Sequence, residues 1–180
     1  MKRGPKLMFG LLVLGALAVA GGPAQADSPG PYYATPSWDQ TMPSATRFIV
    51  LSNFGSAAVL DRETGLVWEK SPDTNLYTWA EGQVHCNTLN VGNRKGWRLP
   101  AIQELASLVD PSVPLPGPTL PAGHPFSNVQ SNTYWSATTF ASSTSNAWGV
   151  FLVNGDVSPG FKAFSVFVWC VRGGQGVDPQ

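Results

Sequence analysis

The feature that most constrains the fold of this chain is its pair of cysteines. The sequence of 180 residues contains only Cys86 and Cys170. A disulfide between them closes a loop of about 85 residues, and the chain-entropy model gives such a loop a stabilisation of about 4 to 5 kcal/mol. Neither cysteine lies in a CxxC pair or beside a set of metal ligands. A disulfide needs an oxidising compartment, so the prediction depends on export of the chain.

The first 26 residues have the order of a secretory signal peptide. Three basic residues precede an uncharged run over residues 7–20, and small side chains follow at Ala24 and Ala26. The run is about 14 residues long, whereas a bilayer-spanning helix needs roughly 20. No cysteine follows the run to take a lipid. We therefore expect cleavage after Ala26, no membrane anchor afterwards, and a secreted or periplasmic protein in which Cys86 and Cys170 form a disulfide.

Charge and composition narrow the class of the mature protein. Cleavage removes three of the 11 basic residues and none of the 11 acidic ones, which leaves a formal charge of about −3. Nucleic acid is therefore not an expected partner. Only 12% of the residues are charged and seven are tryptophan, a composition that predicts an apolar core beneath a polar, uncharged surface. The mature length suits one domain.

Proline marks the boundaries of that domain. Residues 27–46 hold four prolines and no apolar period, which predicts an extended arm or linker whose three aromatic side chains favour docking. We expect the folded domain over residues 47–174 and a flexible tail over residues 175–180.

The first half of the domain predicts a hairpin followed by two short helices. A strand is expected at 48–51, and a hairpin pairs 58–60 with 66–68. A capping box of Thr and Glu starts a helix at 78–90. A second helix, with proline at its first position, is expected at 100–109.

The second half predicts loops and strands. Six prolines between residues 111 and 125 predict a long surface loop. Strands are expected at 134–138 and 148–153, with a hairpin turn at Asn154-Gly155. The apolar run at 166–171 predicts a central strand covered on both faces. The fold class is α+β, with two short helices packed on a twisted, mainly antiparallel sheet and long loops.

Five motifs resemble those of the Lcl C-terminal domain family and occur in the expected order. They are Leu60–Trp68, Cys86–Asn90, Gly96–Pro100, Tyr134–Thr138 and Trp169–Gly173. The resemblance covers the chain from about residue 57 to residue 174.

This resemblance implies a C-type-lectin-like fold, in which a cysteine on the first helix is bonded to one on the last strand. Cys86 and Cys170 occupy those two positions, in agreement with the disulfide argued from export and count. The chain departs from the family at Ala101, where a capping Thr is usual, so we expect the start of the second helix to be weakened by about 1 kcal/mol.

Basic residues cluster at one place in the sequence. Guanidinium groups suit sulfate and carboxylate, and the family's namesake, a bacterial collagen-like adhesin, implies sulfated glycans as ligands. Arg98 lies inside a family motif and is expected to pair with a buried carboxylate or carbonyl. Arg94 and Lys95 are therefore the candidate ligand-binding residues of this cluster.

Two further candidates have simpler structural explanations beside the functional one. Trp148, like Trp135, either stacks on a sugar ring or packs in the core. Asn128 either joins Asn154 and Asp156 around a calcium ion, or all three serve turns. We keep Asn128 and Trp148 as candidate ligand-binding residues, and we expect no metal and no cofactor.

No catalytic motif appears. GxSxG and HExxH are absent, and His85 and His124 each stand alone. Glu63, Glu69 and Glu81 offer carboxylates for glycoside hydrolysis, but Glu63 lies in a turn and Glu81 caps a helix. We expect a non-catalytic protein.

The sequence therefore favours an exported binding module that recognises a glycan or a protein at the cell surface, through loops at 111–128 and 139–146. The alternative is a structural or assembly component of the bacterial cell envelope, in which the arm at 27–46 docks to a neighbour. An enzyme of unknown type is the third hypothesis.

Overall fold

The computed structural model describes residues 42–173. The predicted signal peptide, residues 27–41 of the predicted arm and the predicted tail at 175–180 lie outside the described residues. A short helix, α1 (Ser44–Arg47), spans the end of the segment predicted as an arm and the first residue of the predicted domain.

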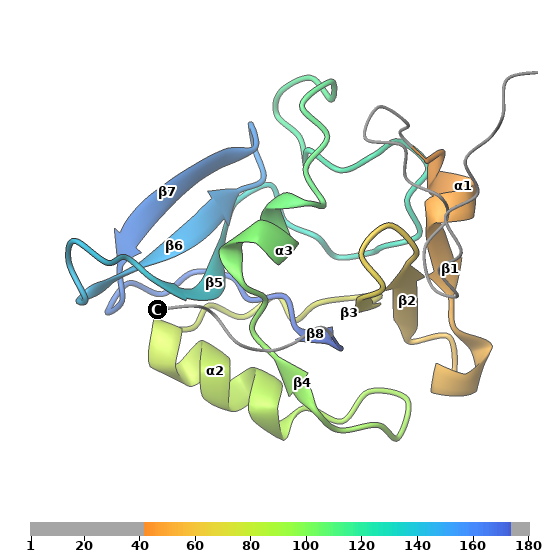
Figure 1. The fold of residues 1–180 in the computed structure, drawn as a ribbon, viewed down its shortest axis with the longest axis horizontal. Coiled ribbons are helices and arrows are strands. Elements are labelled where there is room, and N and C mark those ends of the chain that lie inside the picture. Colours follow the sequence, from red (N-terminus) through yellow and green to blue (C-terminus); the bar gives the residue numbers. More distant parts are fainter. Residues whose placement is uncertain (1–41, 174–180) are drawn as a thin grey trace, which may run out of the picture.

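One sheet has five strands in the order β1-β2-β3-β8-β4, all antiparallel to their neighbours (Figure 1). Its strands are β1 (Phe48–Val50), β2 (Ala58–Asp61), β3 (Val67–Glu69), β4 (Trp97–Arg98) and β8 (Val171–Arg172). A 3-10 turn, η1 (Ser52–Phe54), links the first two strands. The predicted hairpin is confirmed, because β2 pairs with β3 with Val59 opposite Trp68.

The second sheet has three antiparallel strands, β5 (Thr133–Thr139), β6 (Asn146–Phe151) and β7 (Asp156–Phe161). The α+β class is confirmed, with two sheets where one was expected. The turn between β6 and β7 takes four residues, 152–155, because the pairing already begins at Phe151 opposite Asp156. Gly155 alone of the predicted turn pair has a positive φ, of 83°.

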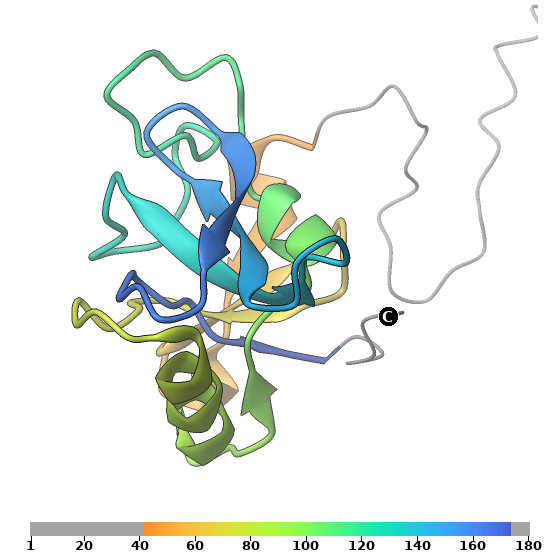
Figure 2. The same ribbon diagram turned by 90° about the vertical axis from the view of Figure 1, so that its left-hand side faces the viewer.

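Helix α2 (Trp79–Thr88) lies beneath the three-stranded sheet in both views (Figures 1 and 2). Its capping box is confirmed, since the Thr78 amide donates to Glu81 Oε2 at 2.9 Å and the Glu81 amide donates to Thr78 Oγ1 at 3.5 Å. The helix ends two residues before the predicted position because Leu89 adopts extended backbone, with φ −60° and ψ 140°.

Helix α3 (Ile102–Ala106) packs against β5 and β6 and is shorter than predicted. Its start lacks a capping side chain at Ala101, as expected. Thr138 on β5 supplies the missing acceptor, because its Oγ1 accepts from the Ile102 amide at 2.9 Å. Glu104 Oε2 accepts from the Ala101 amide at 2.8 Å. The cap is therefore provided by a strand distant in sequence.

The prediction of a continuous strand at 166–171 was wrong. Only β8, at its end, belongs to the five-stranded sheet. Before it, Val166 forms an isolated bridge with Tyr77, and Phe167 forms one with Tyr134 of the other sheet. The segment is apolar because it passes between the two sheets and contributes to both core clusters.

The proline-rich loop is also less superficial than predicted. Within it Thr119 and Leu120 are buried, and Phe126 is 7% exposed. The Phe126 ring lies 5.1 Å from the Phe48 ring and 4.8 Å from the Trp169 ring, between centroids. The loop is therefore anchored in the core at two points.

Candidate functional site

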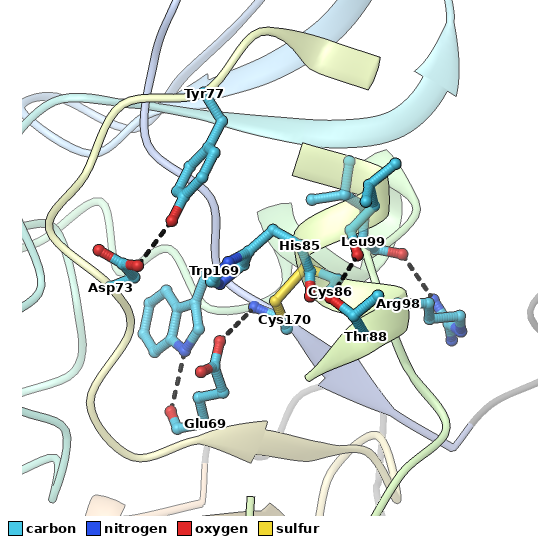
Figure 3. The surroundings of a disulfide bond; sticks show 11 residues. Glu69, Asp73, Tyr77, His85, Cys86, Thr88, Arg98, Leu99, Trp169 and Cys170 are labelled. Carbon is cyan, nitrogen blue, oxygen red and sulfur yellow. Dashed lines mark hydrogen bonds between the residues drawn. A yellow bond between two sulfur atoms is a disulfide. The ribbon is translucent and has the colours of Figure 1, made fainter. Parts of the chain in front are cut away.

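A disulfide joins Cys86 of α2 to Cys170, just before β8 (Figure 3). The two Cα atoms are 5.4 Å apart and both residues are fully buried. The capping box orients α2, and the chain passing between the sheets delivers Cys170 to it. The predicted disulfide is confirmed, and it fixes the helix to the last strand.

Glu69, the last residue of β3, lies directly beside this disulfide (Figure 3). Its Oε2 accepts from the Cys170 amide at 2.9 Å, and its carbonyl accepts from Trp169 Nε1 at 2.9 Å. The residue is 5% exposed, and this burial raises the pKa of Glu69 to about 7, despite the hydrogen bond from Cys170. Glu69 therefore holds the disulfide segment in place.

A cluster of three polar side chains, Asp73, Tyr77 and His85, lies on α2 and on the loop before it. The Tyr77 hydroxyl donates to Asp73 Oδ2 at 2.6 Å, and the Tyr77 ring lies 4.7 Å from the His85 ring, between centroids (Figure 3). Burial opposes ionisation of Asp73, but its hydrogen bonds from Tyr77 and Asn75 outweigh burial and lower its pKa. His85 Nε2 is buried and makes no hydrogen bond to another described residue. Tyr77 and His85 also line a shallow, mostly apolar hollow of about 580 Å³ beside α2, together with Leu76, Ala80, Glu81 and Val84.

Arg94 and Lys95 lie together on the exposed turn between α2 and β4. The Arg94 guanidinium lies over the Phe54 ring, 5.4 Å from its centroid. The backbone of this turn is held by Trp97, whose Nε1 donates to the Arg94 carbonyl at 2.8 Å. Neither Arg94 nor Lys95 forms a salt bridge within residues 42–173.

The structure adds Arg172, which was not among the predicted site residues. Arg172 on β8 pairs in register with Trp97 on β4, and its Nε donates to the Lys95 carbonyl at 2.9 Å. No carboxylate of the described part of the chain pairs with Arg172 either. We call Arg94, Lys95 and Arg172 the basic patch. The position of Arg172 two residues after Cys170 was a usable signal, because the predicted disulfide brings that strand to α2.

Arg98 lies beside this patch but is neutralised. Its guanidinium forms two bonds of 2.7 Å with Glu104 and donates to the Gly173 carbonyl at 2.7 Å. The expectation that Arg98 pairs with a carboxylate or carbonyl is confirmed, except that Glu104 is about one-fifth exposed rather than buried.

The structure does not bring the other two predicted site residues to the basic patch. Trp148 is on β6, in the three-stranded sheet, whereas Trp135 on β5 is 1% exposed. Asn128 has a positive φ of 59° and donates from Nδ2 to Ser71 Oγ at 2.8 Å. The four predicted residues therefore fall into three separate places.

The residues weighed for calcium and for hydrolysis are engaged in structural bonds. Asn154 and Asp156 bond to each other across the turn between β6 and β7. Glu63 forms a salt bridge of 2.9 Å with Arg47. Glu81 caps α2. Among residues 42–173 no group of three or more His, Cys, Asp or Glu side chains is placed to hold a metal ion.

Four of the five sequence motifs meet around the disulfide. The strands β3, β4 and β8 are neighbours in one sheet, and α2 is bonded to the segment that enters β8. The sequence model of the Lcl C-terminal domain family matches residues 57–172, which include this whole arrangement. The chain belongs to the Lcl C-terminal domain family. The resemblance argued from the motifs is thereby confirmed.

Membership of the Lcl C-terminal domain family does not by itself assign an activity. No curated protein matches the chain. Among residues 42–173, none of the helices has the length and apolar character needed to cross a membrane. The disulfide indicates an oxidising compartment, outside the cytoplasm.

Proposed function

We propose that this protein is an exported, non-catalytic binding module that holds an anionic glycan on its basic patch. The single observation that carries the proposal is that Arg94, Lys95 and Arg172 lie together at one sheet edge without a carboxylate partner among the described residues. Uncompensated guanidinium and ammonium groups suit sulfate and carboxylate groups, which they bind by charge-assisted hydrogen bonds.

The scaffold favours this use of the patch. The Lys95 carbonyl and the Trp97 indole fix the backbone from which the three side chains project. The disulfide one residue before β8 limits movement of Arg172 relative to α2. We propose that the scaffold is C-type-lectin-like, as membership of the family implies, and that export follows from the signal peptide expected at residues 1–26.

A charge-matched pair of variants tests the proposal. Binding to immobilised heparin, with neutral dextran as the reference, should weaken by about tenfold in Arg94→Gln plus Lys95→Gln. The control is Arg62→Gln plus Lys70→Gln, which removes the same charge elsewhere and should change binding by less than about twofold. Wild-type binding should also fall steeply between about 50 mM and about 500 mM salt.

Equal losses in the two double variants would show that net charge, and not this patch, attracts the polymer. Absence of heparin binding by the wild type at low salt would overturn the proposal.

A further inference from the structure

The three-stranded sheet presents an uncharged surface. Residues 133–168 contain only two charged side chains, Asp156 and Lys162. Lys162 is turned toward α2, where its Nζ lies 3.9 Å from the centroid of the Trp79 ring and donates to Thr139 Oγ1 at 2.9 Å. Asp156 is bonded to Asn154 at the turn. Charge is therefore absent from the rest of this sheet.

The register places a row of apolar side chains on the face of the sheet that points away from α2. Trp148 pairs with Pro159, and Asn146 pairs with Phe161, so each pair shares one face. Gly160 points to the opposite face, where a Cβ would lie only 2.9 Å from the buried Trp135. Trp148 and Phe161 are therefore on the face opposite Trp135. The same face also carries Tyr134 and Val150, which are fully buried in the other core cluster where α3 packs on β5 and β6. This face is therefore exposed on the β7 side of the sheet, at Val157 and Phe161.

Four aromatic rings lie on or beside this face. The Phe140 and Trp148 rings meet edge to face at 5.1 Å, and the Phe161 and Phe164 rings do so at 5.8 Å, between centroids. Phe161 is 47% exposed and Phe164 is 64% exposed. We call these four residues the aromatic strip. Exposure of large aromatic side chains is costly, so the exposed pair Phe161 and Phe164, beside the strand that carries the half-buried Trp148, indicates a binding surface.

Trp148 also has an unused hydrogen-bond donor. Among the six described tryptophans, four donate their indole N–H to a backbone carbonyl and a fifth is buried, namely Trp79, Trp97, Trp135, Trp169 and Trp68. Trp148 Nε1 makes no hydrogen bond to another described residue and is not buried. The neighbouring Asn146 Nδ2 likewise donates to none of the described residues. Two donors are therefore available beside the rings.

The aromatic rings, the free donors and the absence of charge together indicate what kind of ligand this surface binds. Aromatic rings bind the apolar C–H faces of sugar rings, and indole and amide donors bind hydroxyl groups. A surface without charge complements a ligand without charge. A partner strand is disfavoured, because Pro159 in the middle of the edge strand β7 has no N–H to offer.

We propose that the aromatic strip binds an uncharged polysaccharide, with sugar rings on Trp148 and Phe161 and hydroxyl groups bonded to Trp148 Nε1 and Asn146. This second surface is separate from the basic patch and goes beyond the proposed function. The structure supports the separation, since the patch is on β8 and the turn before β4, whereas the strip is on β6, on β7 and just after β5 and β7 (Figure 1).

Affinity electrophoresis through gels containing amylose, hydroxyethylcellulose, arabinoxylan or glucomannan tests the proposal. At least one polymer should retard the wild type, and the dissociation constant should change by less than about twofold between low and high salt. Phe161→Ser and Trp148→Ala should each weaken binding by about tenfold. The matched control is Leu115→Ser, which alters a side chain of 67% exposure in the proline-rich loop and should bind as the wild type does.

Near-ultraviolet circular dichroism shows whether each variant is folded, and the exposed position of Phe161 keeps the test valid if Trp148→Ala fails to fold. Arg94→Gln plus Lys95→Gln should bind the neutral polymer normally, which separates this test from that of the basic patch. Lack of retardation by all four polymers would overturn the proposal. So would retardation that Phe161→Ser leaves unchanged, or sedimentation showing a dimer that Phe161→Ser dissociates.

Discussion

The two sheets of this domain are stabilised by different kinds of interaction. Fourteen of the sixteen charged side chains in residues 42–173 lie outside residues 133–168, which build the three-stranded sheet. The buried charges, Arg47, Asp61 and Glu69, all lie in or beside the five-stranded sheet. The three-stranded sheet relies on apolar packing and keeps one polar side chain, Ser136, buried.

The Arg47–Asp61 ion pair shows how buried charged side chains hold the five-stranded sheet to its neighbouring helices. Arg47 Nε and Nη2 bond both oxygens of the fully buried Asp61, at 3.0 and 2.9 Å, and Nη2 also donates to the Ser107 carbonyl. Such a forked pair fixes the positions of α1, β2 and the end of α3 together, although its net stabilisation is small. Directional hydrogen bonds therefore fix the five-stranded half, whereas the other half leaves its edge strand β7 exposed. This difference makes the five-stranded half the scaffold.

The largest expected change in the free energy of unfolding comes from removing the disulfide that anchors the five-stranded sheet to α2. Replacing both Cys86 and Cys170 by alanine should lower the free energy of unfolding by about 4 to 5 kcal/mol, because the bond joins two residues that are 84 positions apart in the sequence. Urea unfolding followed by tryptophan fluorescence measures the loss. Reduction of the wild type with dithiothreitol in urea should give the same midpoint as the double variant.

A loss below about 1 kcal/mol would mean that the polar bonds around Glu69 already hold the last strand in place. The five-stranded sheet would then not depend on the disulfide for its stability, and the contrast between the two sheets would not hold.

The next effect concerns the pH dependence contributed by Glu69. Its pKa is about 7 in the folded protein against an ordinary value of 4.5, so the folded state binds the proton more tightly. Stability from this group is fully present below about pH 4.5 and is lost as the pH rises to about 7. Glu69→Gln keeps an acceptor for the Cys170 amide but does not ionise. It should match the wild type near pH 4 and exceed its unfolding free energy by about 3 kcal/mol near pH 9.

Guanidinium unfolding of both proteins at pH 4, 7 and 9 measures this difference. If the difference in unfolding free energy between the variant and the wild type stayed constant from pH 4 to pH 9, Glu69 would titrate as an exposed carboxylate does. The five-stranded sheet would then hold one buried charge fewer.

Local sequence signals predicted the elements that are stabilised locally. The capping box at Thr78 and the hairpin from 58 to 68 depend on residues close in sequence, and both are confirmed. The disulfide was predictable because two cysteines in a chain that is expected to be exported have one available pairing. Arg98 was correctly expected to be paired because it lies inside a family motif, and the structure shows that the helix after this motif supplies Glu104 as the partner.

Features that depend on distant contacts could not be predicted in this way. The run at 166–171 is apolar because both sheets cover it, which a single sequence cannot distinguish from a central strand. Thr138 caps α3 from a strand 36 residues away. The full basic patch could not be predicted for the same reason, since Arg172 contacts Lys95 only through the pairing of β4 with β8.

The smallest expected effect concerns the exposed aromatic side chains at the end of the edge strand β7. Phe164→Ala should lower the unfolding free energy by less than about 1 kcal/mol, because its ring is 64% exposed and little of its area is buried on folding. The matched control is Phe126→Ala, whose ring is 7% exposed between Phe48 and Trp169 and should cost about 3 to 5 kcal/mol. Thermal unfolding by calorimetry compares the two at one pH. Similar losses in both variants would mean that the aromatic strip is part of the packed core, in which case the surface proposed for neutral glycans serves the fold instead.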